Sequence, residues 1–116
     1  MRCESLEVWR RAMELAERIY RDIEVVRGEG DLARQLRAAV VSIASNIAEG
    51  AEREGDAEFA HFLSFASGSC AEVECQLRLG MRFGALRGRA LPEVIVLGQE
   101  VGWMLRALGR RVRGGL

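Results

Sequence analysis

Apolar residues recur at alternating steps of three and four in four segments of this chain. This spacing is the period of an α-helix with one buried face, and it differs from the two-residue alternation of a half-buried strand. The pattern predicts helices over residues 5–27, 31–51, 56–85 and 92–112. The four apolar series are Leu6, Trp9, Met13, Ala16, Tyr20 and Ile23; Leu36, Val40, Ile43 and Ile47; Phe59, Leu63, Ala66, Cys70, Val73, Leu77 and Met81; and Val94, Leu97, Val101, Met104, Leu108 and Val112.

Short breaks separate the predicted helices, at residues 28–30, 53–55 and 87–90. Asp31 and Asp56 stand where N-cap residues are expected, and Pro92 suits the first turn of the last helix. Short connections make successive helices antiparallel neighbours. We find no strand signal, so the chain is predicted to be all-α, a single domain over residues 1–116 folded as an antiparallel, up-down-up-down four-helix bundle.

The predicted bundle leaves apolar residues unassigned. The first helix carries a second stripe that includes Val8 and Leu15, the third ends with Phe83 outside its main series, and Trp103 lies beside the fourth series near Gly98 and Gly102. A small bundle can wrap such residues into its own core. Contiguous apolar patches that stay exposed on a protein surface mark interfaces. The second interpretation assigns an oligomer interface to Val8, Leu15, Phe83 and Trp103.

Residues for catalysis or metal binding are sparse. Glu58 and His61 form one E-x-x-H half-motif, whereas a di-iron bundle needs two such motifs and two further carboxylates, and His61 is the only histidine. We expect His61 at the surface or in an interface. Cys3, Cys70 and Cys75 match neither a disulfide framework nor a C-x-x-C metal site, which favours a reducing compartment. We predict a protein that is not an enzyme, with no metal and no cofactor.

The charges are balanced overall but unevenly placed. All 17 basic residues are Arg and they equal the 17 acids, yet residues 76–116 hold eight Arg against two acids. Like charges gathered in one segment create a local field even when the net charge is zero. No segment is long and apolar enough to suggest a signal or a membrane span. We expect a cytoplasmic protein with no membrane partner and no small-molecule substrate.

A polar stripe runs along the second helix. Ser and Asn are poor choices inside a helix because their side chains compete for backbone hydrogen bonds. A solvated face is the plain explanation. The alternative is a polar seam between the second and third helices, with Gln35 and Arg37 opposite Glu72, that fixes their register and the exit of the chain at Gly50. The residues assigned to this structural motif are Ser42, Asn46, Glu49, Gly50, Arg53 and Glu72.

Several segments carry a family resemblance: "LEVWRRAMELAERIY", "LARQLRAAVVSIASNIAEGAER" and "EFAHFLSFASGSCAEVECQL". They are similar to the bacterial four-helix-bundle proteins encoded in intervening sequences of 23S ribosomal RNA genes. The most specific part is "SIASNIAEG", followed by Arg53 and "EFAHFL". The family pattern falls on Ser42, Asn46, Ile47, Ala48, Glu49, Gly50, Arg53, Phe59, Ser69, Glu72 and Leu77.

The resemblance implies an assembly and a class of partner. The family implies a homopentameric ring, which would use the surplus apolar surface. The same fold resembles the accessory protein of diversity-generating retroelements, which works with a reverse transcriptase and its template RNA. Those accessory proteins are strongly basic, whereas this chain has no net charge. Both resemblances point to nucleic acid rather than catalysis.

We therefore expect an oligomeric bundle that binds RNA or a ribonucleoprotein through the Arg-rich last third of the chain. The alternative is a protein-interaction scaffold, including an accessory subunit to a retroelement reverse transcriptase, with an exposed Trp103 as the docking site. The residues assigned to nucleic-acid binding are Arg82, Arg87, Arg89, Arg106, Arg110, Arg111 and Arg113.

Overall fold

The fold is given by a computed structural model that describes residues 1–114. Residues 115 and 116, which close the predicted domain, lie outside the described part. The element order is η1 (Arg2–Ser5), α1 (Glu7–Asp22), β1 (Glu24–Val25), α2 (Gly30–Glu52), α3 (Asp56–Phe83), β2 (Leu86–Arg87) and α4 (Leu91–Gly114). The four long helices confirm the predicted all-α fold class.

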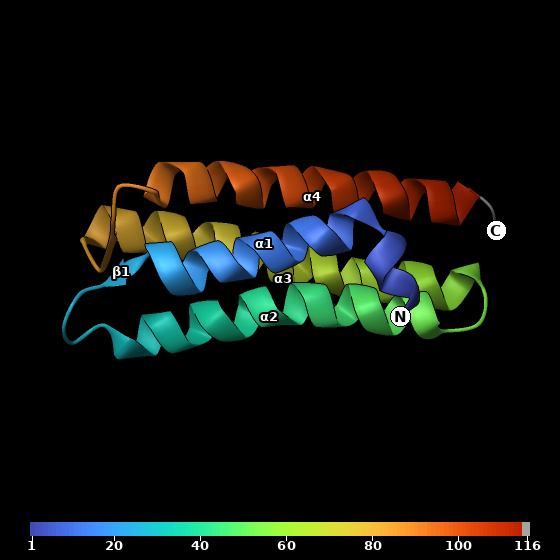
Figure 1. Ribbon diagram of the computed structural model, residues 1–116, viewed down its shortest axis with the longest axis horizontal. Helices are drawn as coiled ribbons and strands as arrows, with labels where there is room; N and C mark the ends of the chain where they lie inside the picture. The colour runs from blue at the N-terminus through green and yellow to red at the C-terminus, as the bar shows by residue number, and fades with distance from the viewer. Residues whose placement is uncertain (115–116) are drawn as a thin grey trace.

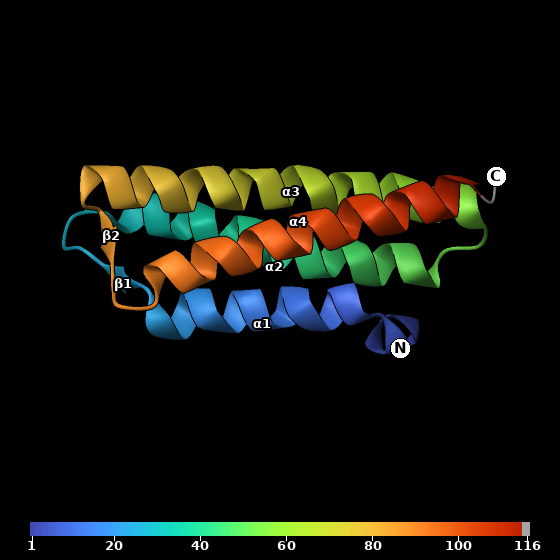
Figure 2. The ribbon, with the colours of Figure 1, turned by 90° about the horizontal axis from the view of Figure 1, so that it is seen from above.

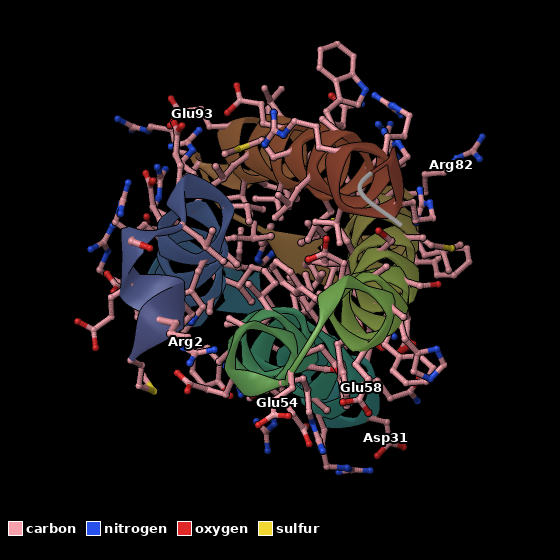
Figure 3. All side chains as sticks on the ribbon, turned by 90° about the vertical axis from the view of Figure 1, so that its right-hand side faces the viewer. Arg2, Asp31, Glu54, Glu58, Arg82 and Glu93 are labelled. Carbon is pink, nitrogen blue, oxygen red and sulfur yellow. The ribbon has the colours of Figure 1, made fainter. Side chains whose placement is uncertain are left out.

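The helices lie side by side along a molecule that measures 47 × 20 × 20 Å. Figures 1 and 2 show α1 and α3 running in one direction and α2 and α4 in the other, as the short connections predict. Seen from one end, α1 and α3 occupy opposite corners of the bundle, and so do α2 and α4 (Figure 3). The apolar side chains meet in the middle of these four corners.

The ends of two helices differ from the prediction. Ile23 already has an extended backbone, with φ −98° and ψ 121°, so α1 ends at Asp22. The chain that follows forms β1, which pairs antiparallel with β2 in the register Glu24↔Arg87 and Val25↔Leu86. The expectation of no strand is therefore wrong. β-Branched Ile and Val favour extended backbone, and α3 stops where Gly84 adopts the left-handed conformation with φ 72°.

The N-cap residues of α2 and α3 also differ from the prediction. The N-cap residues are Glu29 for α2 and Gly55 for α3, one or two positions before the expected Asp31 and Asp56. Both aspartates lie instead in the first turn of their helices, where a negative charge complements the positive end of the helix dipole. Pro92 lies in the first turn of α4 as predicted.

The second stripe of α1 is the more deeply buried one, while Ile23 of the predicted series is also buried and Leu6, Trp9 and Ala16 pack half-buried against the core. Val8, Ala12, Leu15 and Ile19 are buried, whereas Met13 and Tyr20 from the predicted core series are exposed. The two stripes are adjacent on the helix, so the period alone does not select the one that faces α2 and α4. Val8 is 4% exposed and Leu15 is 0% exposed within the single chain. Their assignment to an oligomer interface is therefore wrong, since no surface is left for a partner.

Glycines allow close contacts in the bundle. A Cβ on Gly50 would lie 2.7 Å from the Cβ of Phe62, so the bare backbone of α2 is what lets α3 approach. Gly80 likewise lets Leu86 pack against α3, because the Leu86 side chain fills the space where a Cβ would stand. Leu86 is 2% exposed and thereby anchors β2 to the end of α3.

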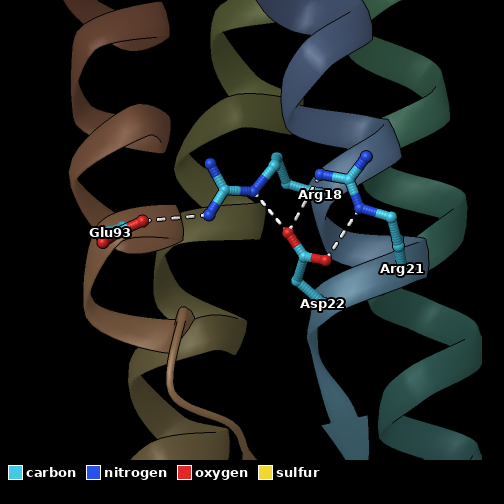
Figure 4. Close-up of polar contacts among 4 residues, drawn as sticks. All are labelled: Arg18, Arg21, Asp22 and Glu93. Carbon is cyan, nitrogen blue, oxygen red and sulfur yellow. Dashed lines mark hydrogen bonds and ion pairs between the residues drawn. The ribbon is translucent and has the colours of Figure 1, made fainter.

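An ion-pair cluster of Arg18, Arg21, Asp22 and Glu93 joins α1 to α4 (Figure 4). The Nε of Arg21 donates to Asp22 at 2.8 Å and the Nε of Arg18 donates at 2.6 Å. These hydrogen bonds from Arg21 and Arg18 lower the pKa of Asp22 from 3.8 to about 2. Arg18 also reaches Glu93 at 3.1 Å, and further along α1 Arg11 pairs with Glu100. Both carboxylates of α4 thus form ion pairs with arginines of α1.

Candidate nucleic-acid interface

The polar stripe of α2 is partly a connection to α3. The Oγ of Ser42 lies 2.9 Å from the Oγ of Ser69, and the Nδ2 of Asn46 donates to the Ser42 backbone oxygen at 2.9 Å. Arg53 pairs with Glu49 at 2.7 Å and its guanidinium lies 5.0 Å from the centre of the Phe62 ring. Ser42 and Arg53 therefore join α2 to α3, whereas Asn46, among the described residues, bonds only to Ser42 of its own helix.

Glu72 does not take part in this connection. Its Oε1 accepts a hydrogen bond from Gln76 of the same helix at 3.4 Å, and within residues 1–114 no hydrogen bond or ion pair joins Glu72 to α2. Arg37 lies over the ring of Tyr20 in α1, at 5.2 Å from its centre. The expected seam of Gln35 and Arg37 with Glu72 is therefore not formed.

The seven arginines assigned to nucleic-acid binding lie at two ends of the bundle. Arg82, Arg87 and Arg89 are near the α3–α4 connection, whereas the other four are in the last turns of α4. At a rise of 1.5 Å per residue, the helix between Leu91 and Arg110 alone spans roughly 28 Å. The predicted set is thus two surfaces, and Arg87 at the first end is 3.3 Å from Glu24.

The second surface is the C-terminal half of α4, with Arg106, Arg110, Arg111 and Arg113 exposed. Among residues 1–114, none of these four guanidinium groups forms an ion pair. Their charge also complements the negative end of the helix dipole, which stabilises the last turns of α4. In Figure 3 the acidic side chains Glu54 and Glu58 lie by α2 and α3, across the bundle from α4. A positive field therefore remains over α4.

Two hollows flank Arg106. One, about 400 Å³, is lined by Trp103, Arg106, Ala107 and Arg110. The other, which we call the α3–α4 groove, measures about 200 Å³ and is lined by Leu63, Ser64, Ser67, Leu105, Arg106, Gly109 and Arg113. Trp103 is 71% exposed. Arginines, hydroxyl groups and an exposed indole are thus gathered on one stretch of surface.

Sequence reasoning missed Ser64 and Ser67. They stand three residues apart on α3, a spacing that places both hydroxyls on one face of the helix. That spacing was the available signal, but nothing in the sequence places Arg106 and Arg113 across the groove from them. The pairing depends on how far α4 slides along α3, which only the packed bundle defines.

The cysteines differ in exposure. Cys70 is buried on the core face of α3, as predicted, and its Sγ donates to the backbone oxygen of Gly98 at 3.3 Å. Burial and, to a smaller extent, the carboxylate of Glu74 raise the pKa of the Cys70 thiol from 9.0 to about 12, and Arg106 opposes the rise. Cys3 is also buried, whereas Cys75 is exposed.

The described part of the chain holds neither a candidate metal centre nor a membrane-spanning helix. In residues 1–114 no group of three or more His, Cys, Asp or Glu side chains is placed to hold a metal ion. In the same residues no helix has the length and hydropathy to cross a membrane. His61 is exposed and makes an edge contact with Phe65, with ring centres 4.4 Å apart.

Comparisons with known proteins identify the family. A solved structure from Bacteroides thetaiotaomicron, described as a protein with unknown function from the S23 ribosomal protein family, superposes with a TM-score of 0.77. It is 22% identical, and the match covers 95% of this chain and 99% of the other, which shows a shared fold. A search of curated proteins found no match. The model of the 23S rRNA-intervening sequence protein family matches residues 4–107, so the chain belongs to that family.

Proposed function

We propose that this protein is a non-enzymatic, oligomeric bundle that binds RNA or a ribonucleoprotein through the C-terminal half of α4. The observation that carries the proposal is the group of four exposed arginines, Arg106, Arg110, Arg111 and Arg113, without carboxylate partners among residues 1–114. Unpaired arginines bind phosphate because the guanidinium fork matches the phosphate oxygens. The family name adds an association with ribosomal RNA genes.

The proposal is tested by fluorescence anisotropy with a structured RNA at two salt concentrations. Each phosphate contact releases counterions, so affinity should fall steeply as salt rises. The double variant Arg110→Glu, Arg111→Glu should lose most of the affinity at low salt. Unchanged affinity in this variant would remove α4 from the binding surface.

A matched control distinguishes loss of the binding site from the change in net charge. Arg27→Glu with Arg78→Glu makes the same change in net charge on two other exposed residues outside the candidate surface. This control should keep the affinity for RNA. A thermal melt of both double variants checks the fold, since the reversals in α4 also oppose the helix dipole by about 0.3–1 kcal/mol each.

We further propose that the protein assembles as a homo-oligomer, and the family resemblance favours a pentamer. Phe83 is 75% exposed, and Leu79, one turn earlier on the same face of α3, is 38% exposed. This apolar end of α3 supports a contact between copies, and repetition of the α4 surface would raise the affinity for one long RNA. Phe83→Asp should lower the assembly mass measured by light scattering.

The alternative of a protein-interaction scaffold, such as an accessory subunit to a reverse transcriptase, is favoured by the same exposed aromatic residues. Trp103 is 71% exposed, and tryptophan is enriched at the centres of protein interfaces. No RNA binding at low salt would support this alternative over the main proposal.

A further inference from the structure

We infer that Trp103 and the α3–α4 groove together hold one unpaired nucleotide of a single-stranded RNA. The base stacks on the indole of Trp103 and its phosphate lies between Arg106, Arg113 and the hydroxyls of Ser64 and Ser67. This inference rests on the proposed function, and it adds the form of RNA that the surface recognises.

The stacking platform is the more unusual part of the site. The indole of Trp103 is 71% exposed, so the face of its ring is accessible to a ligand. Trp103 shares its hollow with Arg106 and Arg110, which follow it by three and seven residues on the same face of α4. An aromatic ring beside two cations suits a base, because bases stack on aromatic faces while the cations contact the phosphates.

The phosphate would bind in the α3–α4 groove, which lies on the other side of Arg106 from Trp103. Arg106 lines both hollows, so a ligand on Trp103 and a ligand in the α3–α4 groove share this guanidinium. Arg113 lies over Gly109, where a Cβ would come within 3.2 Å of its Nη1, so glycine gives the guanidinium room beside the groove. Ser64 and Ser67 add hydroxyl donors from α3. Two cations and two hydroxyls make the groove suitable for one phosphate.

The exposed indole of Trp103 predicts binding of single-stranded rather than duplex RNA. In a duplex the base faces are covered by neighbouring pairs, and only the edges and the phosphates are accessible. Trp103 can therefore contact a base face only where the strand is unpaired. Arginines alone would bind both forms, since phosphate contacts do not distinguish sequence or pairing. The combination predicts a preference for single strands.

The test compares two probes of equal length: fluorescein-labelled ten-nucleotide oligoadenylate, and the same strand paired with its complement. Trp103→Ala should weaken binding of the single strand about tenfold or more, which is the range for loss of one stacked base. It should leave the affinity for the duplex unchanged. Trp103→Phe should restore part of the loss, because a smaller ring still stacks.

Two further variants define the site. Val96→Ala removes another exposed apolar side chain two turns earlier on the same face of α4, and should leave both affinities unchanged. Ser64→Ala with Ser67→Ala should weaken the single strand less than Trp103→Ala does. In a Trp9→Phe protein, Trp103 is the only indole, and its emission should be quenched by oligoadenylate and not by the duplex. Adenosine monophosphate should compete poorly, which distinguishes a strand from a free nucleotide.

The outcomes separate the two proposals. If the Arg110→Glu, Arg111→Glu protein loses RNA while Trp103→Ala keeps full affinity for oligoadenylate, the nucleotide site is wrong and the proposed function stands. If both proteins bind normally, the proposed function is wrong. If Trp103→Ala lowers the assembly mass, Trp103 lies between copies of the chain and the nucleotide site is overturned.

Discussion

The two ends of α4 use charge in opposite ways. At the N-terminal end, Glu93 pairs with Arg18 of α1, and the nearby strand residues Arg87 and Glu24 pair with each other. At the C-terminal end, Arg106 and Arg110 form no ion pair with any described residue. We call them the closed end and the open end. The same residue type holds helices together at one end and remains available for a ligand at the other.

This difference shows why the count of arginines is a poor guide to a binding surface. Residues 76–116 carry eight arginines, but among the described residues only Arg87 pairs with a carboxylate, that of Glu24 in β1, so position rather than number decides which arginine is neutralised. A paired arginine contributes little field beyond its partner, whereas unpaired arginines add. Four experiments test the difference between the closed and the open end.

The largest effect is expected from the apolar anchor of the closed end. Leu86→Ala removes a side chain that is 2% exposed and packed on Gly80, so it should lower the free energy of unfolding by about 2–5 kcal/mol. Val112→Ala near the open end is the matched control, and its half-buried side chain should cost less. Urea denaturation measures both values, and equal losses would show that the two ends are equally well packed.

The open end can be converted into a closed one. Ala107→Glu places a carboxylate three and four residues before Arg110 and Arg111, where acid and arginine pair favourably along a helix. RNA affinity at low salt should fall several-fold, while thermal stability should stay equal or rise. Ala107→Gln has a similar size without charge and serves as the control. Equal RNA affinity for the Glu and Gln variants would contradict the role of unpaired charge.

The pH dependence of the closed end follows from Asp22. Its folded-state pKa of about 2 lies below the ordinary 3.8. The ionised carboxylate therefore stabilises the folded protein fully above about pH 4, and this contribution is lost as the pH falls from 3.8 to about 2. Asp22→Asn should lower the melting temperature at pH 7, and its difference from the native protein should vanish near pH 2. A difference independent of pH would refute this linkage.

The smallest effect is expected from the exposed pair of the two strands. Glu24→Gln breaks the 3.3 Å contact with Arg87, in which both side chains are more than half exposed. Exposed pairs contribute about 0–1 kcal/mol, so stability should change by a few tenths of a kcal/mol. If the released Arg87 made RNA binding stronger, the closed end would be a second binding surface held inactive by Glu24.

Much of the fold could be predicted because helical period and short connections leave few arrangements. The core series of α2 is buried as predicted, from Leu36 to Ile47. The series of α1 was only partly correct: Ile23 is buried and Trp9 packs against the core, but Val8 and Leu15 on the adjacent face are buried more deeply, and only packing decides between the two faces. The pairing of β1 with β2 was missed because each strand has two residues, too few for any period.

The candidate site was only partly predictable. Trp103 and the arginines of α4 are visible as residue types in the sequence, but their division from Arg82 and Arg89 requires the length and direction of α4. Ser64 and Ser67 become part of the site because of the axial register between α3 and α4, two helices whose contacting residues are distant in the sequence. Contacts of this kind depend on three-dimensional packing, and no local pattern encodes them.

The unequal exposure of the three thiols offers a way to count chains. Cys70 and Cys3 are buried, and the Cys70 thiol, with its pKa near 12, is almost wholly protonated at neutral pH. A maleimide dye added to the native protein should therefore react at Cys75 alone. Each chain would carry one fluorophore on the outside of α3. The number of photobleaching steps from a single particle would then equal the number of subunits in it.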